Sequence, residues 1–194
     1  MLRKSLILTA ISLIGSIIGF IVQLKIAHRF GSGIIVDAYI YSISTPTFIS
    51  ALISGLFSYI VAPRMAYING EIDKQNIYIL SILVLSIIIS IIIFVAGNLL
   101  KKLQYALLPN GSLIPKIDSF ELLMILGWCI ASVQVLLSSL TAVLNGLKKP
   151  LISSLLNIGP YVGMLGANIV VTNGGIEIIS IGLLTGTASS FLIA

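Results

Sequence analysis

A short polar segment between the first two apolar stretches contains the charged residues that are best placed to bind a ligand. Lys25 and Arg29 are four residues apart, so both side chains lie on one face of a helix. Gly31 and Gly33 follow and allow a tight turn, after which Asp37 opens the next apolar stretch. A carboxylate is favoured at a helix N-terminus by the helix dipole, and it could also pair with Arg29 across the turn.

Two interpretations of these charges are open. Lys and Arg side chains at a helix end extend to lipid headgroups in many membrane proteins, and Asp37 would then only cap the following helix. In the functional interpretation, Lys25 and Arg29 line a cavity that binds an anionic substrate, and Asp37 is their counter-ion. His28 fits either interpretation.

The charged segment lies between long apolar stretches that are free of Asp, Glu, Lys and Arg. They are Ser5–Leu24, Ala38–Pro63, Gln75–Leu100, Leu122–Leu147, Pro150–Ile176 and Ile178–Ala194. About 20 apolar residues cross the hydrocarbon core of a bilayer as a helix. With 58% hydrophobic residues, 9% charged residues and a mean hydropathy of +1.15, the chain is not a soluble domain. We therefore predict an all-α, multi-pass membrane protein with six transmembrane helices.

The first stretch is a retained helix and not a secretory signal, because it is too long and no small-residue cleavage site precedes the charges after it. An N-terminus on the cytoplasmic side places six Lys and Arg residues inside and five outside. The inner set is Arg3, Lys4, Arg64, Lys74, Lys148 and Lys149, and the outer set is Lys25, Arg29, Lys101, Lys102 and Lys116. We adopt this orientation.

Small and polar residues inside the stretches form rows that either pack helices closely or line a path. The rows are Gly15 and Gly19, Gly159 and Gly163, Gly182 and Gly186, and Ser50, Ser54 and Ser58. Pro46 and Pro160 each remove a backbone hydrogen bond, so we predict local helix breaks or kinks there. Uncharged polar residues in or near the spans are costly in lipid unless paired, and they are Gln23, Gln134, Asn145, Asn157 and Asn168.

The sequence does not have the residues of an enzyme. It has no paired intramembrane carboxylates, no Cys/His cluster with metal spacing, no serine with a plausible histidine partner and no phosphate-binding glycine loop. We expect no catalytic residue, no metal site and no cofactor. Basic residues are few and scattered, so the pI of about 9.4 points to membrane lipids or a phosphorylated lipid and not to nucleic acid.

Two patches of the sequence resemble one known family. The first is Ile17-Ile18-Gly19-Phe20, Ala27-His28-Arg29-Phe30-Gly31-Ser32-Gly33, Asp37-Ala38-Tyr39, Pro46, Gly55 and Ala62-Pro63. The second is Ala142-Val143-Leu144-Asn145-Gly146, Pro150 and Leu155-Leu156-Asn157-Ile158-Gly159-Pro160. Both are similar to the MviN/MurJ-like lipid II flippases of the multidrug, oligosaccharidyl-lipid and polysaccharide exporter superfamily, over about residues 20–63 and 142–160.

This resemblance implies a carrier in the bacterial cytoplasmic membrane, built of two pseudo-symmetric six-helix lobes around a cationic cavity. Such a carrier moves a polyprenyl-pyrophosphate-linked oligosaccharide across the membrane by alternating access. Residues 1–194 would be its N-terminal lobe, because the chain stops within an apolar run. Its partners would be the lipid-linked oligosaccharide, membrane lipids and the second lobe of a longer chain.

The chain departs from the family pattern at its cations. Ser16 stands where the peptidoglycan flippases have an arginine, and Val22 and Gln23 stand in place of an Arg-Asp pair. Nothing from Ala38 to Pro63 is charged, so Lys25 and Arg29 are the cations left to bind the substrate. These departures favour a related cell-envelope precursor over lipid II itself. The alternatives are a cation-coupled multidrug antiporter and a non-transporting membrane scaffold.

Overall fold

The computed structural model describes residues 2–31, 33–68, 70–108, 113–114, 119–170 and 174–193, with side chains from residue 6 onward. Every regular element in these ranges is a helix, as predicted. The helices are α1 Leu2–Phe30, α2 Ile34–Tyr67, α3 Ile72–Ala106, α4 Phe120–Gly146, α5 Pro150–Leu156, α6 Gly159–Val170 and α7 Glu177–Ile193. The side chains of Arg3, Lys4 and Lys116, which entered the charge count, lie outside the described part.

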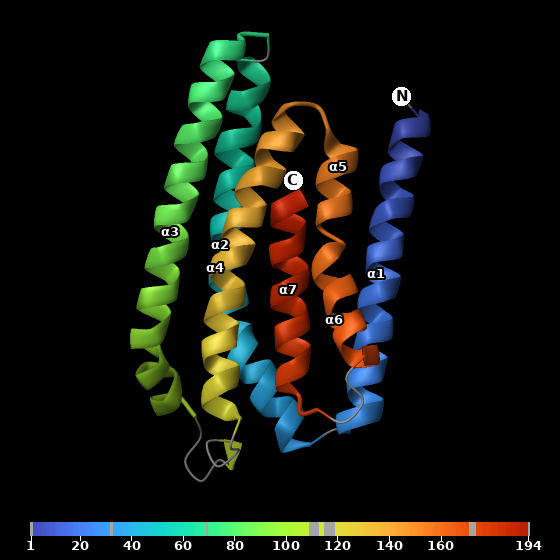
Figure 1. Ribbon diagram of the computed structural model, residues 1–194, viewed down its shortest axis with the longest axis vertical. Coiled ribbons are helices and arrows are strands. Elements are labelled where there is room, and N and C mark those ends of the chain that lie inside the picture. Colours follow the sequence, from blue (N-terminus) through green and yellow to red (C-terminus); the bar gives the residue numbers. More distant parts are fainter. Residues whose placement is uncertain are drawn as a thin grey trace.

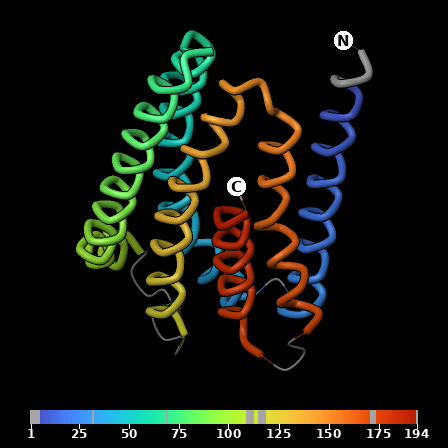
Figure 2. The backbone as a smooth tube through the Cα atoms, turned by 45° about the horizontal axis from the view of Figure 1, so that its top comes forward, coloured from blue at the N-terminus to red at the C-terminus, as the bar shows by residue number. Residues whose placement is uncertain are grey.

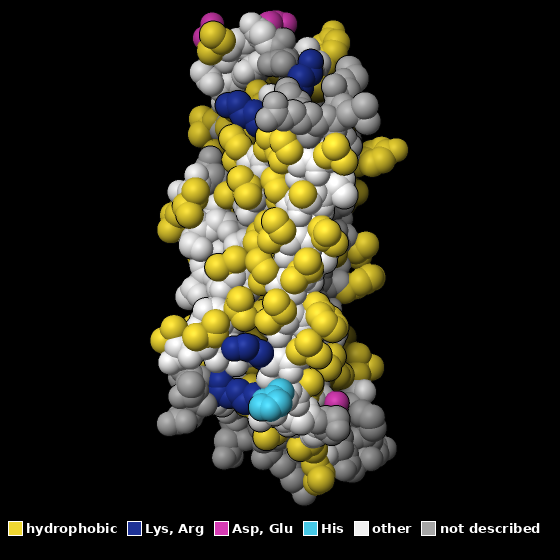
Figure 3. Space-filling view, turned by 90° about the vertical axis from the view of Figure 1, so that its right-hand side faces the viewer, with side chains coloured by type: hydrophobic (Ala, Val, Ile, Leu, Met, Phe, Trp, Pro, Cys, Tyr) yellow, Lys and Arg dark blue, Asp and Glu magenta, His cyan; other side chains and the backbone are white. Residues whose placement is uncertain are grey.

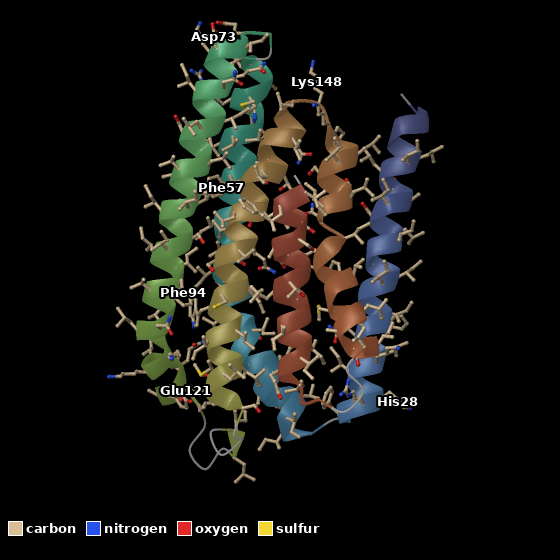
Figure 4. The ribbon with its side chains drawn as sticks, in the orientation of Figure 1. His28, Phe57, Asp73, Phe94, Glu121 and Lys148 are labelled. Atoms are coloured by element: carbon tan, nitrogen blue, oxygen red, sulfur yellow. The ribbon has the colours of Figure 1, made fainter. Side chains whose placement is uncertain are left out.

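The helices run up and down alongside one another (Figure 1). Each long helix reverses the direction of the one before it, and α5 and α6 follow one another along a single line. One end of the molecule therefore carries Asp73 and Lys148, and the opposite end carries His28 and Glu121 (Figure 4). The alternating direction of the long helices agrees with the alternating crossings predicted from the apolar stretches.

Four helices are long and apolar enough to cross a membrane within the described part of the chain: α1, α2, α3 and α4. The fifth predicted span is not one helix, because α5 and α6 have only 7 and 12 residues and are separated by Asn157 and Ile158. The last helix, α7, has 17 residues and falls just short of a full span. The structure therefore supports a multi-pass membrane protein with four clear crossings.

The surface fits this environment. Over α1, hydrophobic side chains cover the middle of the molecule, whereas Lys, Arg, Asp, Glu and His side chains lie near its two ends (Figure 3). Large apolar side chains such as Leu80, Ile92 and Leu99 on α3 are more than half exposed. Lipid tails are as apolar as these side chains, so their exposure carries no penalty in a bilayer.

Helix α4 is the centre of the packing, with α2, α3 and α7 around it. Trp128 of α4 is buried, and its ring lies against Gly97 of α3, where any side chain larger than hydrogen would overlap the ring. Trp128 Nε1 donates to Gln104 Oε1 at 3.2 Å. The indole therefore fills the α3–α4 interface and keeps a polar partner in the apolar interior.

The glycine rows pack helices, which was one of the two interpretations. A Cβ atom at Gly163 of α6 would overlap the backbone of Gly182 and Gly186 of α7. On α1, the ring of Tyr161 packs against Gly19. A Cβ atom added at Gly19 would lie 3.3 Å from Tyr161 Cε1. Small residues thus let α6 approach α7 and α1 closely.

Pro46 does not break α2, which continues through it as one helix. Proline at this position cannot donate to the carbonyl of Ser42, four residues earlier. Gly127 of α4 packs onto that oxygen, and a Cβ at Gly127 would also lie 3.3 Å from Pro46 Cγ. Neighbouring helices are known to compensate prolines in transmembrane helices in this way.

The predicted break near Pro160 is confirmed. The fifth span is interrupted at Asn157 and Ile158, and Pro160 lies in the first turn of α6, where its missing N–H has no helical acceptor to lose. At the other predicted turn, Gly31 has a φ of +69°, which favours glycine, but Gly33 has a φ of −126°, which any residue adopts. Only Gly31 is needed for its conformation.

Candidate functional site: an uncharged polar cleft

The predicted cationic residues lie together near the α1–α2 turn. Lys25 and His28 are exposed on α1, and Arg29 is partly buried. Asp37 lies in the first turn of α2, as predicted, and is exposed. The salt bridges between described residues join Lys74 to Glu71 and Lys101 to Glu121, so the expected pairing of Asp37 with Arg29 is not among them.

Arg29 contacts a different part of the chain. Its Nη1 donates to Asn168 Oδ1 at 3.3 Å, and its Nη2 donates to the carbonyl oxygen of Gly174 at 2.7 Å. The guanidinium also lies 5.1 Å from the centre of the Phe30 ring. Arg29 therefore joins the end of α1 to the end of α6 and the segment before α7, a contact that the sequence did not indicate.

A cleft of about 810 Å³ lies elsewhere, among α1, α2, α4, α6 and α7. Helices α1 and α2 meet at their turn and diverge toward the end that carries the N-terminus (Figures 1 and 2). The cleft lining carries no charged side chain and includes neither Lys25 nor Arg29. It consists of Gln23, Tyr39, Ile40, Ile43, Ser44, Thr47, Ser50, Ala51, Ser54, Ser58, Gln134, Leu137, Ser138, Thr141, Asn157, Pro160, Tyr161, Met164 and Leu183.

Hydroxyl groups line the α2 wall of this cleft. Ser50, Ser54 and Ser58 all contribute, so this row lines a hollow, which was the other interpretation of such rows. Thr47 Oγ1 donates to the Ile43 carbonyl at 2.7 Å and Ser54 Oγ to the Ser50 carbonyl at 2.7 Å. Each such hydroxyl is satisfied as a donor by its own helix and still offers lone pairs to the cleft.

Carboxamides line the other walls. Ser50 Oγ donates to Gln134 Oε1 at 2.8 Å, which links α2 to α4 within the cleft lining. Gln23 faces the cleft from α1, and Asn157 faces it from the interruption between α5 and α6. Asn157 and Tyr161 also border a smaller hollow of about 240 Å³ that includes Ser16. The resemblance expects an arginine at that serine.

The chemistry of this cleft is hydrogen bonding without charge. Amide and hydroxyl groups at membrane depth are costly unless they contact water, one another or a ligand. From the sequence, Gln23, Gln134 and Asn157 were expected to need polar partners in the membrane, but they were not expected to form one site. Within the described ranges, no group of three His, Cys, Asp or Glu side chains comes together to hold a metal ion.

Comparison of the chain with known protein families, curated proteins and solved structures finds no match in any of the three.

Proposed function

We propose that this chain is one lobe of a transporter that flips a polyprenyl-pyrophosphate-linked oligosaccharide across the bacterial cytoplasmic membrane. In this proposal, α5 with α6 forms the fifth crossing and α7 the sixth, so the lobe has six crossings. A second lobe faces the cleft, and rocking of the two lobes gives alternating access. The protein is a carrier and not an enzyme.

The observation that carries the proposal is the uncharged polar cleft at membrane depth. A purely structural membrane scaffold has no need for a hollow of about 810 Å³ lined by serines, threonines and carboxamides. A path for sugars through a bilayer needs such groups, because each hydroxyl that leaves water must find a new partner. The interrupted fifth span adds support, since transporters place broken helices beside their binding sites.

The divergence of α1 and α2 supports alternating access. Helices α1 and α2, two of the five helices that line the cleft, are connected by the short turn at Gly31 and separate toward the opposite end. With the N-terminus on the cytoplasmic side, this arrangement corresponds to a cleft that widens toward the cytoplasm. Relative movement of α1 and α2 about the turn would change which end is open.

The same cleft disfavours a cation-coupled antiporter. Coupling to protons or sodium ions uses carboxylates inside the spans, and the cleft lining contains none. Asp37 and Glu177 lie in the first turns of α2 and α7, at the ends of these helices. The lipid-linked sugar is therefore the preferred cargo.

The test is depletion of the full-length protein in its host cell. Spheroplasts would be treated with an impermeant glycan-oxidising reagent, and the oxidised share of the lipid-linked oligosaccharide would be measured by mass spectrometry. We expect this share to fall severalfold on depletion while total lipid-linked oligosaccharide rises. An unchanged share with loss of cation-driven dye efflux would instead indicate an antiporter, and an unchanged share with normal efflux would indicate a scaffold.

A further inference from the structure

Three carboxamides from separate parts of the chain line one cleft. Gln23 comes from α1, Gln134 from α4 and Asn157 from the interruption between α5 and α6. Gln134 Oε1 shares the Ser50 hydroxyl proton with the Thr47 carbonyl, and its amide nitrogen donates to no other residue in the described part of the chain. Neither Gln23 nor Asn157 makes a side-chain hydrogen bond to another residue in the described part of the chain.

An amide outside the cleft behaves differently. Asn98 lies on α3, outside the cleft lining, and its Nδ2 donates to the Phe94 carbonyl of its own helix at 2.9 Å. A transmembrane helix can thus satisfy an asparagine locally. The cleft amides are left open, although an unpaired amide in an apolar setting costs about 1–3 kcal/mol.

The geometry points to a binding site for the uncharged, hydroxyl-rich part of a glycan, with Gln134 and Asn157 as the residues that recognise it and Gln23 on the opposite wall. A sugar hydroxyl both donates and accepts, and a carboxamide offers a donor and an acceptor side by side. A charged group would find no counter-ion in this lining, so its desolvation would be uncompensated. The site therefore selects neutral sugars over acidic ones.

Tyr161 gives the site an apolar surface beside Asn157. Its side chain lines the cleft and remains 43% exposed, and its ring is seated on Gly19 of α1. A tyrosine combines a flat apolar face with a polar tip, which suits a ligand that carries C–H groups on one face and hydroxyls at its edge.

This inference rests on the proposed function for the source of the glycan, which is a lipid-linked precursor. A free oligosaccharide would offer the same hydroxyl groups. Both probes are therefore needed: the lipid-linked oligosaccharide extracted from the host, and the soluble glycan released from it by mild acid.

Binding of both probes to the purified full-length protein would be measured by calorimetry for the wild type, Asn157→Ala, Gln134→Ala and the control Asn98→Ala. Asn157→Ala removes no internal hydrogen bond, so it tests the site even if Gln134→Ala weakens the fold. We expect each cleft variant to weaken binding of both probes by about tenfold, the effect of losing one or two hydrogen bonds to the ligand. Asn98→Ala should bind like the wild type.

The experiments distinguish failure of the proposed glycan site from failure of the proposed transport function. Wild-type affinity in Asn157→Ala and in folded Gln134→Ala would overturn the glycan site, even if depletion shows that the protein flips lipid-linked sugar. Amide-dependent binding of the released glycan with unchanged flipping on depletion would support the site and overturn its lipid-linked source. Equal affinity for an acidic oligosaccharide of the same length would overturn the selection for neutral sugars.

Discussion

At the scale of single residues, the hydrogen bonds of Arg29 indicate a structural role. Arg29 is partly buried, and it holds Asn168 and the Gly174 carbonyl together through two donors of one guanidinium. The fixed fork of arginine suits such a double contact, which lysine cannot reproduce. Lys25, one helical turn earlier, is exposed and remains available to lipid headgroups or substrate.

Arg29→Ala should therefore lower the free energy of unfolding of the detergent-solubilised full-length protein by about 1–2 kcal/mol, because charged hydrogen bonds are lost. Its melting temperature should fall accordingly. Arg29→Lys should recover only part of this loss. Lys25→Ala is the control on the same helix face, and we expect its melting temperature to match the wild type. Equal melting temperatures for Arg29→Ala and Lys25→Ala would show that the contact contributes nothing to stability.

A second prediction at this scale concerns Lys25 and the anionic part of the proposed substrate. If its ammonium group attracts the pyrophosphate, Lys25→Ala should reduce oligosaccharide export severalfold at unchanged membrane abundance, and Lys25→Arg should retain export. Asp37→Asn should have a smaller effect, as expected for a counter-ion. Export and abundance would be measured by spheroplast oxidation and immunoblotting. Normal export in Lys25→Ala would leave the headgroup interpretation.

At the scale of elements, the α6–α7 pair depends on the absence of side chains. Gly163 faces Gly182 and Gly186 so closely that the two backbones are in contact. Gly166, three residues further along α6, has open space where its Cβ would lie. One helix therefore offers both a glycine that packing requires and one that it does not.

Gly163→Ala should destabilise the protein by about 1–3 kcal/mol, because the added methyl forces the two helices apart. Gly166→Ala should be neutral or stabilising by up to about 1 kcal/mol, since alanine restricts the unfolded chain and favours the helix. Thermal unfolding in detergent, followed by circular dichroism, would compare the two. The same loss in both variants would mean that helix propensity and not close packing decides.

At the scale of the whole molecule, the alternating helices place two ends on opposite sides of the membrane. Lys149 follows α4 at the end shared with Lys148, and Lys102 lies at the end of α3 shared with Glu121. Both side chains are exposed. The charge count alone separates these sides poorly, so the orientation is an experimental question.

We expect Lys102→Cys, in a Cys129→Ser background, to react with an impermeant maleimide in intact cells. Lys149→Cys should react only after the membrane is permeabilised, because it would lie in the cytoplasm. Labelling would be measured by gel shift, with the Cys129→Ser protein as the blank. The reverse pattern would invert the orientation and with it the direction in which the cleft opens.

The helices and several details of their course could be predicted from the sequence alone. Long uncharged stretches specify helices in lipid because each backbone amide must find its partner within the same segment. The tight turn at Gly31 and the interruption before Pro160 were also predictable, because glycine and proline act on the backbone locally. Pro46 does not interrupt α2, and Gly127, far away in the sequence, packs against the carbonyl that the proline leaves free.

Which polar residues come together depends on the packing of the helices and could not be predicted from the sequence. A serine or glutamine in a span can face lipid, a neighbouring helix or a hollow, and hydropathy is the same in each case. The direction that each side chain faces follows from helix rotation and packing, which brought Gln23, Gln134 and Asn157 to one cleft and turned Arg29 toward Asn168. The resemblance led to an expected cationic cavity, whereas the cleft that the folded helices form is uncharged, because its walls come from the charge-free middles of the spans.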